Sequence, residues 1–157
     1  MKAATVHEIK DELQNLSAPK LTAICLRLAK FKKENKELLT YLLFEAGDNE
    51  GYIQSVKLEM DDLFEEINFS NLFFVKKTLR KILRNTNKHI RYVSDKTAEV
   101  ELLLYFCEQI KARKIPLNKS VLLSNIYNSQ KKKLEKLIAV LHEDLQYDFL
   151  QRVKELH

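Results

Sequence analysis

Glycine and proline are scarce in this sequence, with two of each in 157 residues. Tight β-hairpin turns depend on glycine because it adopts positive φ angles at little cost. A protein with many short strands and turns is therefore disfavoured. With Gly47 and Gly51 as the only glycines, a glycine-rich phosphate-binding loop is excluded as well. Leucine, lysine and glutamate are abundant instead, and all three favour helices. The composition predicts an all-α protein with short connections.

Long apolar runs are also absent. No run approaches the roughly 18 apolar residues that cross a membrane as a helix, and residues 1–10 lack the apolar region of a secretory signal. Cys25 and Cys107 lie within apolar helical patterns, which is more typical of buried thiols than of a disulfide. We expect a cytoplasmic protein in a reducing compartment, without a membrane partner.

Sequence motifs for catalysis and metal binding are missing. The four histidines are His7, His89, His142 and His157, and none has the spacing of a helical zinc or di-iron motif. Neither cysteine has a base close to it in the sequence, and no Gly-x-Ser-x-Gly motif occurs. We therefore expect no catalytic residue, no metal site and no cofactor. An enzyme whose residues assemble from distant helices is the least favoured alternative.

Apolar residues recur every three or four positions along most of the chain, in segments separated by capping residues. Thr5 and Glu8 form a capping box, and Pro19 suits the first turn of a helix that begins after Ser17. These signals predict seven or eight helices in antiparallel pairs, within a single domain over residues 1–157. Each pair spans about 35 to 45 residues, a period like that of HEAT arrays. We therefore prefer a short αα superhelix, with a compact orthogonal bundle as the alternative.

The segment Lys36–Ala46 has apolar side chains on almost every side. A helix of this kind is usually buried, so we expect it to lie at the centre of the core and to end at Gly47 as its C-terminal glycine. On this interpretation, Leu42→Ala would lower the free energy of unfolding by ~2–5 kcal/mol.

Two neighbouring segments carry opposite charge. Residues 51–68 hold five acidic side chains and one lysine, whereas residues 71–94 are basic and contain no acid. Both have helical spacing, which predicts a helical hairpin at the centre of the chain. On the basic helix, at ~100° per residue, six cations fall on the side opposite the apolar face. This cationic stripe consists of Lys77, Arg80, Lys81, Arg84, Lys88 and Arg91.

The cationic stripe has two interpretations. Antiparallel packing would bring the acids at the end of the first segment near the cations at the start of the second, so that the charges pair within the molecule. The residues expected to pair are Asp62, Glu65 and Glu66 with Lys76, Lys77 and Arg80. Alternatively, the stripe binds a polyanion such as a nucleic acid backbone. The net charge of +5 permits an acidic partner without requiring one.

These observations favour a non-catalytic helical binding or scaffold module whose partner is a protein. The alternative is a nucleic-acid-binding module that uses the basic helix over residues 76–91, with the cationic stripe as its polyanion-binding surface. The sequence does not predict an oligomeric state.

Overall fold

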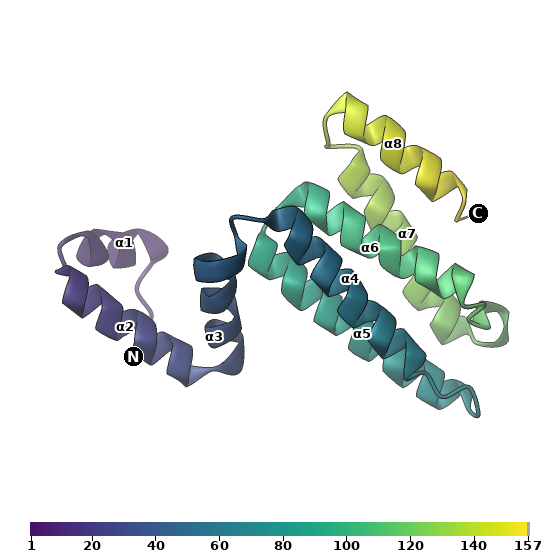
Figure 1. Cartoon of the computed structure of the whole chain (residues 1–157), viewed down its shortest axis with the longest axis horizontal. Helices are drawn as coiled ribbons and strands as arrows, with labels where there is room; N and C mark the ends of the chain where they lie inside the picture. The colour runs from purple at the N-terminus through teal and green to yellow at the C-terminus, as the bar shows by residue number, and fades with distance from the viewer. Residues whose placement is uncertain (157) are drawn as a thin grey trace. The chain divides into compact units, whose positions relative to one another are not determined.

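The computed structural model describes residues 1–156 (Figure 1). Within that range the chain forms eight α-helices, one π-helical turn and one 3₁₀ turn, and no strand. The all-α prediction is therefore confirmed. The chain divides into two compact units, of which the first is Met1–Glu45 and the second begins at Ala46. The expectation of one domain for the whole chain stays a prediction.

The first unit is a short run of helices. It comprises α1 (Val6–Gln14), α2 (Ala18–Phe31), α3 (Lys33–Thr40) and a π-helical turn (Tyr41–Glu45). The predicted capping box is present, because the Thr5 hydroxyl accepts from the Glu8 N–H and the Glu8 carboxylate accepts from the Thr5 N–H. None of the three α-helices contains a buried residue. The first unit therefore has helices but very little core.

The second unit contains five α-helices within the described residues. They are α4 (Asn49–Glu65), α5 (Leu72–Val93), α6 (Lys96–Ala112), α7 (Val121–Ile138) and α8 (Glu143–Lys154), with a 3₁₀ turn at Leu117–Lys119. Each helix begins at a side chain that accepts a hydrogen bond from a backbone N–H in the first turn, which satisfies a donor that the helix itself leaves unpaired. The caps are Asp48, Asn71, Asp95, Ser120 and His142.

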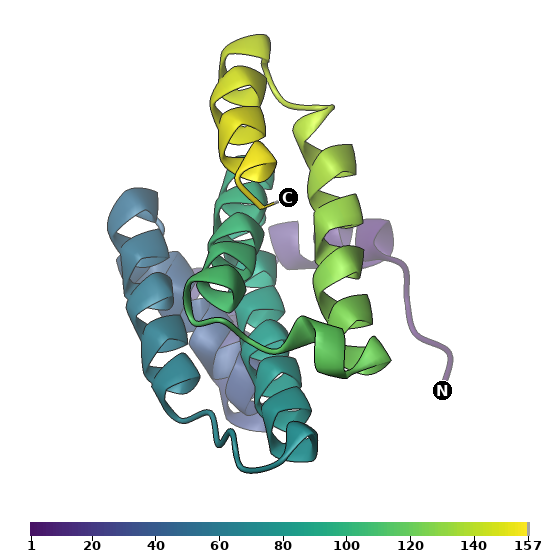
Figure 2. The same cartoon turned by 90° about the vertical axis from the view of Figure 1, so that its right-hand side faces the viewer.

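Helix α6 is the centre of the second unit. It packs against α4, α5 and α7, which surround it in Figures 1 and 2. The consecutive leucines 102, 103 and 104 are all fully buried. Successive residues of a helix point about 100° apart, so α6 must be covered on most sides. These contacts are consistent with a compact bundle, and the superhelical repeat is not confirmed.

The leucine-rich segment that we expected at the centre of the core is exposed, so that prediction is wrong. It forms the end of α3 and the π-helical turn, where Leu42 is 56% exposed and Phe44 is 77% exposed. Gly47 does not adopt the positive φ of a C-terminal helix glycine either. The physical reason is that apolar periodicity shows how much apolar surface a helix has, but not whether other helices pack against that surface. In this chain α4, α5 and α7 pack around α6.

An ion network links α8 to α6 and α4. Arg152 on α8 donates to Glu101 at 2.6 Å and to Glu108 at 2.8 Å, and Lys57 on α4 donates to the same Glu101. Burial raises the pKa of Glu101, but the hydrogen bonds from Arg152 and Lys57 outweigh burial and hold this pKa below its usual value of 4.5. The network therefore stabilises the second unit at neutral pH and weakens in acid.

Leu103→Ala should lower the free energy of unfolding by ~2–5 kcal/mol, because it leaves a cavity in a fully covered helix. Leu58→Ala is the matched control, since Leu58 is 67% exposed on α4, and its cost should stay below ~1 kcal/mol. Urea unfolding at neutral pH measures both values. Equal costs for the two variants would contradict the central position of α6.

Glu101→Gln should lower the free energy of unfolding by ~1–3 kcal/mol at neutral pH, since it weakens the charged network. The folded-state pKa of Glu101 lies below the unfolded value near 4.5, so its contribution is complete above that value and is lost as the pH falls through the folded pKa. The difference between wild type and variant should shrink below pH 4.5 in a series of urea titrations. A difference that persists unchanged in acid would show that the Glu101 charge does not supply the stability.

Candidate functional site

The cationic stripe lies along the outer side of α5. The inner side of this helix carries Val75, Leu79 and Ile82, all fully buried. Apolar and charged residues lie on opposite sides of α5. When the apolar side is buried, the cations therefore face solvent. Of the six predicted residues, Lys77, Arg80, Lys81, Arg84 and Arg91 are exposed, and Lys88 is half-buried. The structure therefore brings all six onto one face of one unbroken helix.

Residues outside the stripe engage acids of α4. Arg113, which follows α6, forms ion pairs with both Asp61 and Glu65. Asp61 also accepts a hydrogen bond from Tyr105 on α6 at 2.7 Å. The sequence predicted that Glu65 would pair with the start of the basic helix, and this prediction is wrong because Arg113 holds that carboxylate. No sequence signal marked Arg113 as the partner, since the contact spans 48 positions.

An ion pair crosses the hairpin between Lys81 and Glu66, at 3.1 Å. Both side chains are more than half exposed, so the pair contributes only ~0–1 kcal/mol. Within residues 1–156, Lys77, Arg80 and Arg84 have no acidic partner. The expected neutralisation of Lys77 and Arg80 is therefore also wrong, and these two cations, together with Arg84, keep their charge without an acidic partner in the described part of the chain. Elsewhere on α5, Glu66 pairs with Lys81, and Glu59 accepts a hydrogen bond from Asn85 and pairs with His89.

Two open hollows flank the stripe. One, of about 580 Å³, is lined by Phe73, Lys76, Lys77, Arg80, Leu83, Arg84 and Asn87. The other, of about 300 Å³, is lined by Asn68, Phe74, Lys77, Thr78, Lys81 and Arg84. Lys77 and Arg84 line both hollows, so they form the ridge between them. The surface offers apolar and cationic groups side by side.

Two phenylalanines give this surface its aromatic character. Phe73 and Phe74 are 56% and 42% exposed. Their rings pack edge to face, with 5.8 Å between the ring centres. The ammonium group of Lys76 lies 5.4 Å from the centre of the Phe73 ring, within the range of a cation–π contact. Exposed phenylalanines beside unpaired cations form a mixed surface that can contact both apolar and anionic groups of a ligand.

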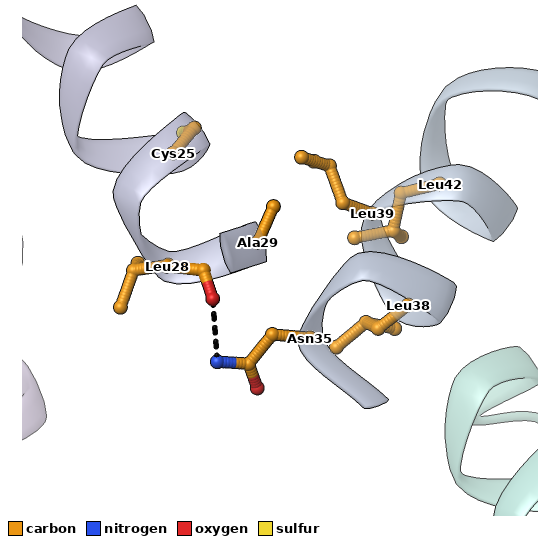
Figure 3. Close-up of a pocket in the computed structure, with 7 residues that line it drawn as sticks. All are labelled: Cys25, Leu28, Ala29, Asn35, Leu38, Leu39 and Leu42. Atoms are coloured by element: carbon orange, nitrogen blue, oxygen red, sulfur yellow. Dashed lines mark hydrogen bonds between the residues drawn. The ribbon is translucent and has the colours of Figure 1, made fainter. Parts of the chain in front are cut away.

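A second surface, the apolar groove, lies between α2 and α3 in the first unit (Figure 3). It has a volume of about 230 Å³ and is lined by Cys25, Leu28, Ala29, Asn35, Leu38, Leu39 and Leu42. Leu39 extends into the space between the two helices. The Asn35 side chain donates to the Leu28 carbonyl at 2.9 Å and so fixes the corner between α2 and α3. Sequence reasoning missed the groove because it assigned these leucines to the core.

The two cysteines have different environments. Cys107 is buried, and burial raises the pKa of its thiol to about 12, so it is protonated at neutral pH. Cys25 is exposed at the apolar groove, and the expectation that it is buried is wrong. Within residues 1–156 no group of three His, Cys, Asp or Glu side chains is placed to hold a metal ion. His157 lies outside the described residues.

Comparison of the chain with protein-family models, curated proteins and solved structures finds no match. None of the helices in residues 1–156 combines the length and the apolar character that a bilayer crossing requires.

A thiol reagent should modify Cys25 quickly in the dilute native protein, because this cysteine is exposed, and should modify Cys107 only after unfolding. Counting modified thiols by mass spectrometry, before and after adding denaturant, measures the difference. Rapid native modification of Cys107 would mean that α6 is not covered. The Cys25→Ser variant identifies which thiol has reacted.

Proposed function

We propose that this protein is a non-catalytic helical binding module, that the cationic stripe of α5 and its two hollows form the binding surface, and that the ligand is an acidic segment of another protein. The observation that carries the proposal is the coincidence of unpaired cations with exposed apolar side chains. Lys77, Arg80 and Arg84 have no acidic partner within residues 1–156, and Phe73 and Leu83 lie in the same hollow.

The dimensions of the surface suit a helix as ligand. From Lys77 to Arg91 the stripe covers roughly 21 Å, at about 1.5 Å per residue. An amphipathic partner helix of similar length could place acids three or four residues apart against the cations, and apolar residues against Phe73 and Leu83. Burying the apolar contacts would supply affinity, while the charges would set orientation and association rate.

A nucleic acid is the second candidate, and a specific observation favours it. Phe73 and Phe74 are exposed next to lysines and arginines, and aromatic rings beside cations bind single strands by stacking and by phosphate contact. We rank it second because Glu66, paired with Lys81, lies beside the same surface and repels phosphates. The net charge of +5 is also modest, which limits non-specific attraction to a polyanion.

The variant Lys77→Gln/Arg80→Gln/Arg84→Gln should weaken binding of an acidic amphipathic peptide by a factor between about 3 and about 150, since three exposed pairs at ~0.2–1 kcal/mol each are lost. The probe is a fluorescent helical peptide of leucine and glutamate with a repeat of three to four residues. A scrambled peptide of the same composition controls for charge alone. Fluorescence anisotropy at ~0.15 M salt measures the affinities.

The matched control protein is Lys132→Gln/Lys136→Gln/Lys154→Gln, which removes the same charge from exposed positions on α7 and α8. It should bind like the wild type. Phe73→Ala should weaken peptide binding without changing its salt dependence, because the lost contact is apolar. If instead oligonucleotides bind at sub-micromolar concentration at ~0.15 M salt and the stripe variant abolishes this, nucleic acid binding replaces protein binding.

A further inference from the structure

The first unit exposes an unusual amount of apolar surface. Nine large apolar side chains between Val6 and Phe44 are at least 39% exposed. On α2, Ile24, Leu28 and Phe31 are spaced four and three residues apart, so they share one helix face. Leu42 lines the apolar groove beside Leu28. Among the described residues, Tyr41 is the one buried apolar residue of the first unit, and the main core cluster includes none of its residues.

A unit of 45 residues with so few buried side chains gains little hydrophobic stabilisation of its own. The nine exposed side chains, at roughly 100 Å² each, amount to the ~800 Å² per partner that a standard protein interface buries. The nine side chains lie on more than one side of the unit, since Leu26 points to the side of α2 opposite Ile24. The face of α2 and the apolar groove supply part of this area, and an exposed apolar patch of that kind is typical of an interface.

The charges of the same unit are complementary to each other. Helix α1 carries Glu8, Asp11 and Glu12, all exposed. The corner between α2 and α3 has a net positive charge: it carries the acids Glu34 and Glu37, of which Glu37 pairs with Lys33, against five exposed cations, Arg27, Lys30, Lys32, Lys33 and Lys36. Arg27, Lys30 and Lys32 have no acidic partner within residues 1–156. In a two-fold arrangement, each acidic helix of one copy can face the basic corner of the other copy.

We infer that the apolar groove and the adjoining face of α2 bind a second copy of this chain, giving a two-fold homodimer held by the first units. This inference goes beyond the proposed function, because it involves neither α5 nor an acidic ligand. The apolar face supplies the buried area, and the acidic α1 and basic corner set the pairing of one copy with the other. The stripe of each copy is not part of this interface.

The full-length double variant Leu28→Asp/Leu42→Asp should weaken dimerisation by about tenfold or more, because it places charges in the apolar contact. Both leucines are exposed, so the second unit should unfold at the same urea concentration as in the wild type. Sedimentation velocity over a concentration series measures the dissociation constant. Leu58→Asp, at an exposed position of α4, should leave it unchanged.

A charge exchange tests the pairing itself. Asp11→Lys/Glu12→Lys and Arg27→Glu/Lys30→Glu should each weaken dimerisation of the chain that carries them, because each makes the facing charges alike. An equimolar mixture of the two variants should dimerise again, because the exchanged acidic and basic groups then face each other. Circular dichroism verifies that both variants keep their helices.

Cys25 reports whether the interface includes the apolar groove, which it lines. Its rate of alkylation should fall several-fold as the protein becomes dimeric and recover on dilution, whereas buried Cys107 stays unreactive throughout. A wild-type chain that remains monomeric over the whole concentration series overturns the inference. A dimer in which Cys25 reactivity does not change with concentration also overturns it, since the copies would then meet elsewhere.

Discussion

Arg113 engages two acids of α4, Asp61 and Glu65, and the charge left on the cationic stripe depends on this contact. Its guanidinium pairs with Asp61 and Glu65 and lies 5.3 Å from the centre of the Phe64 ring. The hydrogen bond to Glu65 is the largest influence on the pKa of Arg113 and raises it. Burial opposes this rise, and the charges of Glu65 and Asp61 add to it. A planar guanidinium can satisfy two carboxylates at once. Two acids are thereby engaged on the α6 side of α4, and so they do not neutralise α5.

The packing of the second unit also leaves the charge of α5 on the outside. Helix α6 is covered by α4, α5 and α7, and α5 contributes its apolar side to that cover. Its opposite side is left with Lys77, Arg80 and Arg84 exposed and with Phe73 exposed among them. The exposed face of α5 is therefore a consequence of core formation, and its chemistry suits an acidic amphipathic ligand.

The sequence predicted that the chain is all-helical, because the signals of helices are local. The Thr5 capping box and the cap of α4 at Asp48 depend on residues within three positions of each other. The membership of the cationic stripe followed from helical periodicity alone. Periodicity could not predict which charges pair with each other, because the contact between Arg113 and Glu65 joins residues 48 positions apart. Leu42 and Leu103 have equally apolar surroundings in the sequence, and only the packing of whole helices separates the exposed one from the buried one.

The most direct test of the account is to map the acidic amphipathic peptide onto the full-length chain by two-dimensional amide NMR. If the cationic stripe binds it, the largest shift changes should follow the outer face of α5, at Lys77, Arg80, Arg84 and the neighbouring Phe73. The amide signals of Lys132 and Lys136 on α7 should not shift. These two side chains are also exposed cations, but neither of them lines the two hollows. Shift changes confined to α7 or α8, or spread evenly over all lysines, would contradict the assignment of α5 as the binding surface.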